Sequence, residues 1–246
     1  MKNKNLSIFV LLAGVISTAH AEGKFDGPYL GISYGTAWGN VSEGTGHWAD
    51  QFSLYTTEGK SSDFGSAAIG INAGYNFSLS SNNVIGIEID NHYLNDTANG
   101  EALNYDTSFN IVSDRLLSET SINNIQTLRL KLGHVFGDLH LYGTLGLAHT
   151  NVDRKVTQVD DGRGYQWFAV GASNRKEESI FGYALGAGAD YSINDKLMMN
   201  AKYLFTDFGD TTYHYSGVAF GIANSVGKQK VGINNSMLTL GVSYHF

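Results

Sequence analysis

The chain has 246 residues, and its 16 Lys and Arg against 23 Asp and Glu give a formal net charge of −7 at neutral pH. This acidic balance argues against a nucleic-acid-binding protein, which needs a basic surface, and the absence of cysteine excludes disulfides, thiol catalysis and Cys-ligated metal sites. Thirty glycines, a single proline and 12% aromatic residues favour many strands and tight turns, while 42% hydrophobic residues exclude a disordered chain.

Residues 1–21 have the three parts of a secretory signal peptide. Lys2 and Lys4 form a positive start, the apolar run that follows is too short to span a bilayer, and residues 19–21 form a small-x-small cleavage site. The mature chain is therefore expected to begin at Glu22 and to leave the cytoplasm. No later stretch has the eighteen or so apolar residues of a membrane helix, which leaves a secreted soluble protein or a membrane β-barrel.

Eight stretches of the mature chain alternate between apolar residues and small or polar residues, as strands with two different faces do. In chain order they span about residues 28–41, 67–79, 84–95, 121–137, 139–151, 180–193, 196–208 and 235–246. The last is the clearest, with Leu238 and Leu240 on one face and Thr239 on the other. Leu204 and Phe208 break the alternation in the seventh stretch.

The connections between these stretches alternate in length. Residues 80–83, 137–138 and 194–195 predict tight hairpin turns. The segments between the hairpins are polar and are expected as long loops, at about residues 42–65, 96–120, 153–178 and 209–234. Short turns on one side and long loops on the other are typical of an up-and-down barrel in a bacterial outer membrane, where an even number of strands returns both chain ends to the periplasmic side.

Soluble barrels and membrane barrels differ in which face of their strands contacts water. A soluble eight-stranded barrel, such as a lipocalin-like carrier, buries its apolar face around a ligand and covers its outside with charge. Here the second face is mainly Gly, Ala, Ser, Thr and Asn with few charges, which suits a narrow lumen better than a soluble exterior. Aromatic residues near the ends of the apolar face resemble the interfacial girdles of membrane barrels, although an ordinary β-core would also bury aromatics.

Six charged residues on the second face are expected to meet inside the barrel. They are Glu88, Asp90, Arg129, Lys131, Asp190 and Lys202. The first four lie at comparable depth on the third and fourth stretches, and the last two are diagonal neighbours across a hairpin. Because an unpaired buried charge is costly, we expect a salt-bridged network that fills the lumen rather than a catalytic site. Eight strands leave room only for side chains, so a continuous pore is not favoured.

Several strand motifs resemble the small outer-membrane β-barrel superfamily, which includes opacity-type adhesins and the surface-antigen "porin family" proteins of alphaproteobacteria. The likeness lies in residues 182–191, 194–197, 202–209, 127–133 and 142–146. The resemblance agrees with an all-β fold in which residues 22–246 form an eight-stranded antiparallel up-and-down transmembrane β-barrel with four long external loops. It also implies that Tyr244 and Phe246 act as a signal for the outer-membrane insertion machinery. No ligand-binding residue of that superfamily can be mapped onto the loops.

Function on a rigid barrel usually resides in its loops. The third long segment is the most distinctive, because it combines an arginine with aromatic residues, the types that dominate protein and glycan contacts. These residues are Arg163, Tyr165, Trp167 and Phe168. The plainer alternative is that they fold back on a neighbouring loop or extend a strand. None of the loops has the ligand spacing of a zinc or EF-hand site, and no cofactor is predicted.

We therefore predict a non-enzymatic surface protein in the outer membrane of a Gram-negative bacterium, an antigen, adhesin or envelope-structure protein. Its expected partners are outer-membrane lipid and a host-surface protein or glycan, with no nucleic acid. The first alternative is a small porin that admits small solutes. The second is a lipid-modifying enzyme, which needs a Ser, a His and a carboxylate in contact. Ser243 and His245 share one face, but that face points inward and no carboxylate is evidently near.

Overall fold

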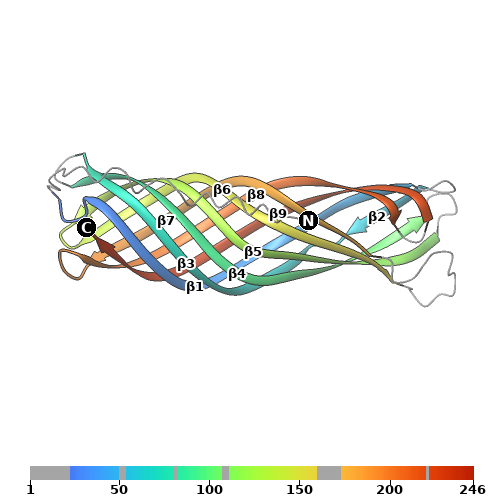
Figure 1. Ribbon diagram of the computed structural model, residues 1–246, viewed down its shortest axis with the longest axis horizontal. Coiled ribbons are helices and arrows are strands. Elements are labelled where there is room, and N and C mark those ends of the chain that lie inside the picture. Colours follow the sequence, from blue (N-terminus) through green and yellow to red (C-terminus); the bar gives the residue numbers. More distant parts are fainter. Residues whose placement is uncertain (1–22, 50–53, 80–81, 107–110, 160–172, 220–221) are drawn as a thin grey trace, which may run out of the picture.

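The computed structural model shows a chain built almost entirely of β-strands (Figure 1). The structure describes residues 23–49, 54–79, 82–106, 111–159, 173–219 and 222–246. The strands are β1 (Gly27–Ala49), β2 (Leu54–Gly59), β3 (Ser62–Ser78), β4 (Asn83–Asp106), β5 (Ile111–Phe136), β6 (Leu139–Val159), β7 (Ser173–Ser192), β8 (Leu197–Ala219) and β9 (Ile222–His245). Among the described residues, no helix is long and apolar enough to cross a membrane. The predicted signal peptide lies outside the described residues and stays a prediction.

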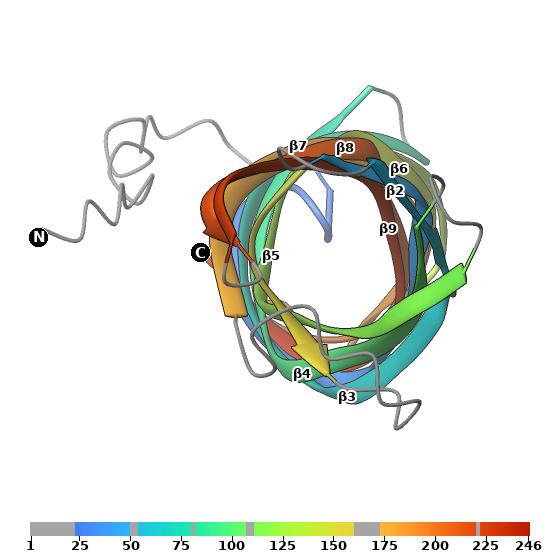
Figure 2. The same cartoon turned by 90° about the vertical axis from the view of Figure 1, so that its right-hand side faces the viewer.

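The strands form one antiparallel sheet that closes on itself into a tube. From β3 onward each strand pairs with the next, and β1 pairs with β9 along most of its length, which closes the ring that Figure 2 shows end-on. β2 and β3 share one register along β1, since Ala49 lies opposite Leu54 and Val41 lies opposite Ser62. The two therefore act as one strand interrupted at residues 60–61, and the ring is eight-stranded as predicted.

Short turns join the strands at one end of the tube, on the left in Figure 1. Gly137 lies in the predicted turn between β5 and β6 and has a φ of 64°, a conformation that glycine adopts without strain. The turn between β7 and β8 spans residues 193–196. Phe246 also lies at this end, where its backbone N–H donates to the carbonyl of Pro28 at 3.1 Å. We call it the short-turn end and the opposite one the long-strand end.

Towards the long-strand end, the strands run further than the alternation predicted. β4 continues to Asp106 and β5 begins at Ile111, where a loop was expected over residues 96–120. The other segments expected as long loops also consist almost wholly of strand in their described parts, at residues 42–65, 153–178 and 209–234. Backbone hydrogen bonds pair these extensions. Their outward side chains are mostly polar, so the apolar outer face that marked the other strands is missing there.

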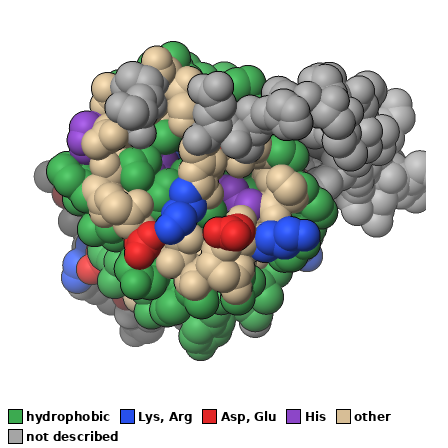
Figure 3. All heavy atoms as spheres, turned by 90° about the vertical axis from the view of Figure 1, so that its left-hand side faces the viewer, with side chains coloured by type: hydrophobic (Ala, Val, Ile, Leu, Met, Phe, Trp, Pro, Cys, Tyr) green, Lys and Arg blue, Asp and Glu red, His purple; other side chains and the backbone are tan. Residues whose placement is uncertain are grey.

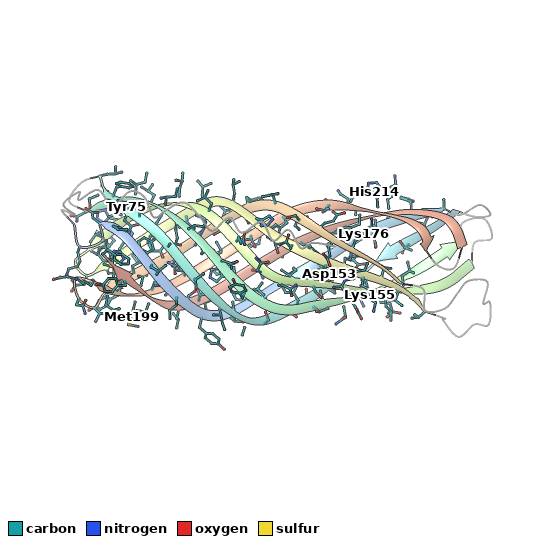
Figure 4. All side chains as sticks on the ribbon, viewed as in Figure 1. Tyr75, Asp153, Lys155, Lys176, Met199 and His214 are labelled. Atoms are coloured by element: carbon teal, nitrogen blue, oxygen red, sulfur yellow. The ribbon has the colours of Figure 1, made fainter. Side chains whose placement is uncertain are left out.

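The apolar face of the alternation lies on the outside of the tube, as predicted. On β9, Leu240 is 67% exposed, whereas Thr239 beside it is only 3% exposed. We call the exposed ring of large side chains on the half nearer the short turns the apolar belt; Met199, labelled in Figure 4, belongs to it. Other members are Leu30, Ile32, Tyr34, Trp38, Ile69, Leu130, Leu145, Phe181, Leu185, Leu238 and Leu240. An apolar exterior is the opposite of what a soluble carrier requires.

Candidate functional site

Glu88 is at the centre of a charge cluster inside the tube. It is completely buried, and its Oε1 accepts a 2.6 Å hydrogen bond from Arg129 Nη2 on the neighbouring strand β5. Its Oε2 accepts a 2.6 Å bond from Lys202 Nζ on β8 and a 2.8 Å bond from the hydroxyl of Tyr29. One carboxylate therefore joins two cations from different walls of the barrel.

Asp90 and Asp190 are the other two carboxylates of this cluster. Arg129 also donates to Asp90, while Lys131 Nζ lies 2.6 Å from Asp190 Oδ2. Asp190 further accepts a 3.2 Å hydrogen bond from the Tyr142 hydroxyl, and Lys131 lies 3.8 Å from the centre of that ring. Three carboxylates thus face three cations, and formal charge within the group balances.

The structure brings together all six of the charged lumen residues named from the sequence, but it partners the last two differently. Asp190 and Lys202 were expected to face each other across the hairpin between β7 and β8. Instead, Lys202 reaches Glu88 and Lys131 reaches Asp190. Sequence reasoning also missed that the hydroxyls of Tyr29 and Tyr142 bind the carboxylates of this cluster. The alternating strands contain many aromatic residues, and nothing in the sequence distinguishes these two. We call the six charged residues the lower cluster, because they lie nearer the short turns.

Leu204 and Phe208, which broke the alternation in the sequence, point into the lumen above the lower cluster. Leu204 is 3% exposed and Phe208 is 5% exposed, and both belong to a continuous group of buried apolar side chains. The group includes Ala37, Val41, Phe64, Ala68, Leu94, Ile122, Ile125, Ala148, Ile180, Leu204, Phe208 and Met237. We call it the apolar layer. The twelve side chains named here have no polar atoms that could bind water or ions, although the polar side chains of Thr206 and Asn235 are buried between them on β8 and β9.

A second ion pair lies beyond the apolar layer, towards the long-strand end. Glu43 on β1 and Arg154 on β6 meet at 3.0 Å, and Gln229 on β9 hydrogen-bonds to both, at 3.2 and 2.9 Å. Ser118 donates to Glu43, and Arg154 stacks 5.8 Å from the ring centre of Tyr213. We call this group the upper cluster. The sequence analysis missed it because Glu43 and Arg154 lie in segments expected as loops.

The first described residues close the short-turn end of the tube. Gly27 has a φ of 96°, and the chain before it turns so that Phe25 is buried, 5.3 Å from the ring of His140. Asn76 donates a 3.0 Å hydrogen bond to the Phe25 carbonyl. Figure 3 shows charged and histidine side chains gathered at this end within a rim of hydrophobic ones.

Lys24 fastens this segment to the turn between β5 and β6. Its ammonium group forms an ion pair with Asp138 in that turn. The hydrogen bond to Asp138, together with the negative charge of the carboxylate, raises the pKa of Lys24 above its ordinary value of 10.5. The side chains of both residues are about half exposed, so the contact lies at the surface.

The remaining sequence candidates lie at the ends of the barrel. Tyr244 and Phe246 point outward at the short-turn end, and their role as an insertion signal stays a prediction. Ser243 and His245 are buried in the lumen, where His245 stacks on Tyr29 with ring centres 5.0 Å apart. The candidate contact residues lie outside the described residues, and their role stays a prediction; they are Arg163, Tyr165, Trp167 and Phe168.

Residues 7–246 match the family model described as an outer membrane protein beta-barrel domain. The chain belongs to this family. The apolar belt therefore faces the lipid of a Gram-negative outer membrane, the short-turn end faces the periplasm, and the long-strand end projects from the cell. The recognition of a small outer-membrane barrel from the strand motifs is confirmed.

The relatives that match the chain are named as outer-membrane proteins. The chain is 26% identical over 227 residues to a 31 kDa outer-membrane immunogenic protein of Brucella melitensis biotype 1, covering 89% of this chain and 79% of the relative. A protein of the same name from Brucella suis biovar 1 matches equally well.

Of two solved structures that match the chain, one has a TM-score above 0.5 and resembles it in fold. The outer membrane protease OmpT of Escherichia coli has a TM-score of 0.54 at 11% identity, covering 94% of this chain and 100% of OmpT. OprG of Pseudomonas aeruginosa has a TM-score of 0.48 at 18% identity, covering 91% of this chain and 99% of OprG. At such identities the likeness to OmpT concerns the barrel alone. That protein is a protease, so a barrel fold by itself does not exclude catalysis.

Proposed function

We propose that this protein is a non-enzymatic and non-conducting surface protein of the outer membrane, with the role of an antigen, adhesin or envelope-structure protein. Its function lies on the projecting part of the barrel rather than in the lumen. The observation that carries this proposal is the filling of the lumen at successive levels, by the lower cluster, the apolar layer and the upper cluster.

A diffusion pore needs a continuous path for water and ions. In the described part of this barrel, an ion entering from the periplasm meets Phe25, and then three cations and three carboxylates that already neutralise one another. Above them it would have to shed its hydration shell to pass the apolar layer. The ion pair between Glu43 and Arg154 follows. Each level opposes conduction for a different physical reason.

Catalysis is disfavoured by the position of the only serine and histidine pair that the sequence suggested. A lipid-modifying enzyme must expose its nucleophile to lipid, whereas Ser243 and His245 are enclosed in the lumen. Display at the cell surface is supported by the 26% identical relative, which is named as an immunogenic outer-membrane protein.

Planar-bilayer recording of the purified protein tests the closed lumen. We expect the wild-type protein to insert without producing stable unit conductances, while an established porin in the same bilayers conducts. A Leu204→Ser, Phe208→Ser variant leaves Phe25 and both charge clusters in place, so it should also insert without stable unit conductances. Stable steps from the wild-type protein would overturn the proposal in favour of the porin alternative.

Labelling of intact cells tests surface display separately. An antibody against the projecting strands should bind cells that express the protein without permeabilisation. Incubation with phospholipid vesicles, followed by mass spectrometry of the lipids, tests for enzymatic activity. Lipid products that disappear in a His245→Ala variant would contradict a non-enzymatic role.

A further inference from the structure

A row of three basic side chains crosses the outer wall of the barrel near the long-strand end. Lys228 on β9 lies directly opposite His214 on β8 and, on its other side, directly opposite His47 on β1. All three side chains are exposed. Their chain neighbours Gln229 and Tyr213 are buried in the lumen, so the row must point outward. Figure 4 shows His214 projecting from the outer edge of the barrel.

This basic row differs from three other exposed cations on the same wall. Lys155 lies 3.5 Å from Glu119, Arg175 pairs with Asp153, and Lys230 lies 2.6 Å from Asp210. Lys228 has no carboxylate within ion-pair distance among the residues that the structure describes. The row therefore presents one ammonium group without a carboxylate, flanked on both sides by imidazole rings that can donate N–H hydrogen bonds. An anion placed on the row would supply the partner that Lys228 lacks among the described residues.

The height of the row indicates which anion it can reach. Leu238 is the last large side chain of the apolar belt on β9, ten residues before Lys228 is reached. At about 3.3 Å per residue and a strand tilt of about 40°, the row lies about 25 Å beyond the belt. The headgroup layer of a bilayer is only about 5–8 Å thick on each side. Lipid phosphates are therefore out of reach.

The row also faces sideways, towards whatever surrounds the barrel in the same membrane. At that height, the surroundings are the saccharide chains of the glycolipid that forms the outer leaflet. We propose that His47, Lys228 and His214 bind the phosphate- and carboxylate-bearing saccharide of this glycolipid. The Lys228 ammonium group pairs with an anionic group, and the flanking imidazoles donate N–H hydrogen bonds to its oxygens. The inference does not depend on whether the lumen conducts.

Isothermal titration calorimetry on the full protein in detergent free of lipopolysaccharide tests the site. The probe is the phosphorylated core oligosaccharide released from lipopolysaccharide by mild acid hydrolysis. Lys228→Gln should weaken binding about tenfold, the loss of one charge-assisted contact. His214→Gln and His47→Gln should each weaken it about threefold. Lys155→Gln is the matched control, since it removes a cation from the same wall that Glu119 already neutralises, and it should leave binding unchanged.

Three results would overturn the proposal. The first is an equal affinity of wild type and Lys228→Gln, or an equal loss in Lys155→Gln, because binding would then follow general charge. The second is equal binding of the oligosaccharide after enzymatic dephosphorylation. The third is binding of dextran sulfate at the row without binding of the core oligosaccharide, which would assign the row to an external polyanion. Retained heat-modifiable gel mobility establishes that each variant is folded.

Discussion

Replacing Glu88 by Gln should strongly destabilise the barrel. The substitution keeps the shape of the side chain but removes the negative charge that Lys202 contacts at 2.6 Å. Arg129 retains Asp90 as a partner, so the main uncompensated charge is that of Lys202, which is 7% exposed. Removing one partner of a buried ion pair costs about 3–5 kcal/mol, and we expect a loss of that size.

Glu119→Gln is the control, because it removes a carboxylate from an exposed pair. The side chains of Glu119 and Lys155 are 53% and 44% exposed, and their charged atoms lie 3.5 Å apart. Solvent screens such a pair, so its loss should cost no more than about 1 kcal/mol. The contrast between the two Glu→Gln variants isolates the effect of burial.

Urea unfolding in lipid vesicles, followed by tryptophan fluorescence, measures both losses. A double variant, Glu88→Gln with Lys202→Met, removes the orphaned charge as well, and it should recover most of the stability that Glu88→Gln loses. The reasoning is refuted if Glu88→Gln costs no more than Glu119→Gln. It is also refuted if adding Lys202→Met deepens the loss, since the lysine would then have a favourable partner other than Glu88.

Substitutions at three further positions test other parts of the barrel by the same unfolding measurement. Leu240→Arg on the lipid face should lower the free energy of unfolding by about 2–4 kcal/mol. Leu240→Phe would overpack a lumen but fits a lipid-facing position, so it should lower that free energy by less than about 1 kcal/mol. Equal losses would contradict the outward facing of Leu240. Phe25→Ala should lower the free energy of unfolding by about 3 kcal/mol, because it leaves a cavity at the periplasmic mouth. An unchanged urea midpoint would show that Phe25 is not packed there. Because the pKa of Lys24 is raised on folding, its pair with Asp138 stabilises the fold below pH 10.5 and is lost as the pH rises through the raised value. The urea midpoints of wild type and Lys24→Met should therefore differ by a constant amount from about pH 6 to pH 9 and converge only above about pH 10.5; convergence at pH 8 would contradict this.

The part of the fold that lipid dictates could be predicted from the sequence. Lipid requires an apolar side chain at every second residue of a spanning strand, and this alternation gave the strand number, the facing and the turn at residues 137–138. Beyond the lipid, both faces of a strand can be polar, so the alternation fades although the backbone pairing continues. Thr97 and Asn99 point outward on either side of the buried Ala98, yet their polarity made the segment resemble a loop.

The sequence predicted which charged residues lie in the lumen, but it did not predict which of them pair with one another. Facing alone identified the six charged residues of the lower cluster. The contact between Lys202 and Glu88 joins positions 114 residues apart, and it depends on the tilt and stagger of the whole barrel. Arg154 was accessible in principle, because Val152, Arg154 and Val156 alternate with outward polar residues. Treating that segment as a loop concealed the pattern.

The apolar layer explains both an ambiguity in the sequence and a constraint on function. Around Leu204 and Phe208, the lumen face also carries large apolar side chains, so a rule that assigns apolar residues to one side must fail there. The same apolar side chains offer little to solvate an ion, which supports the proposal of a non-conducting lumen. If the lumen is closed as proposed, the outer wall and the projecting end are the parts that remain available for binding. The basic row of His47, Lys228 and His214 lies on that wall, beyond the apolar belt, where the barrel can meet other molecules without opening.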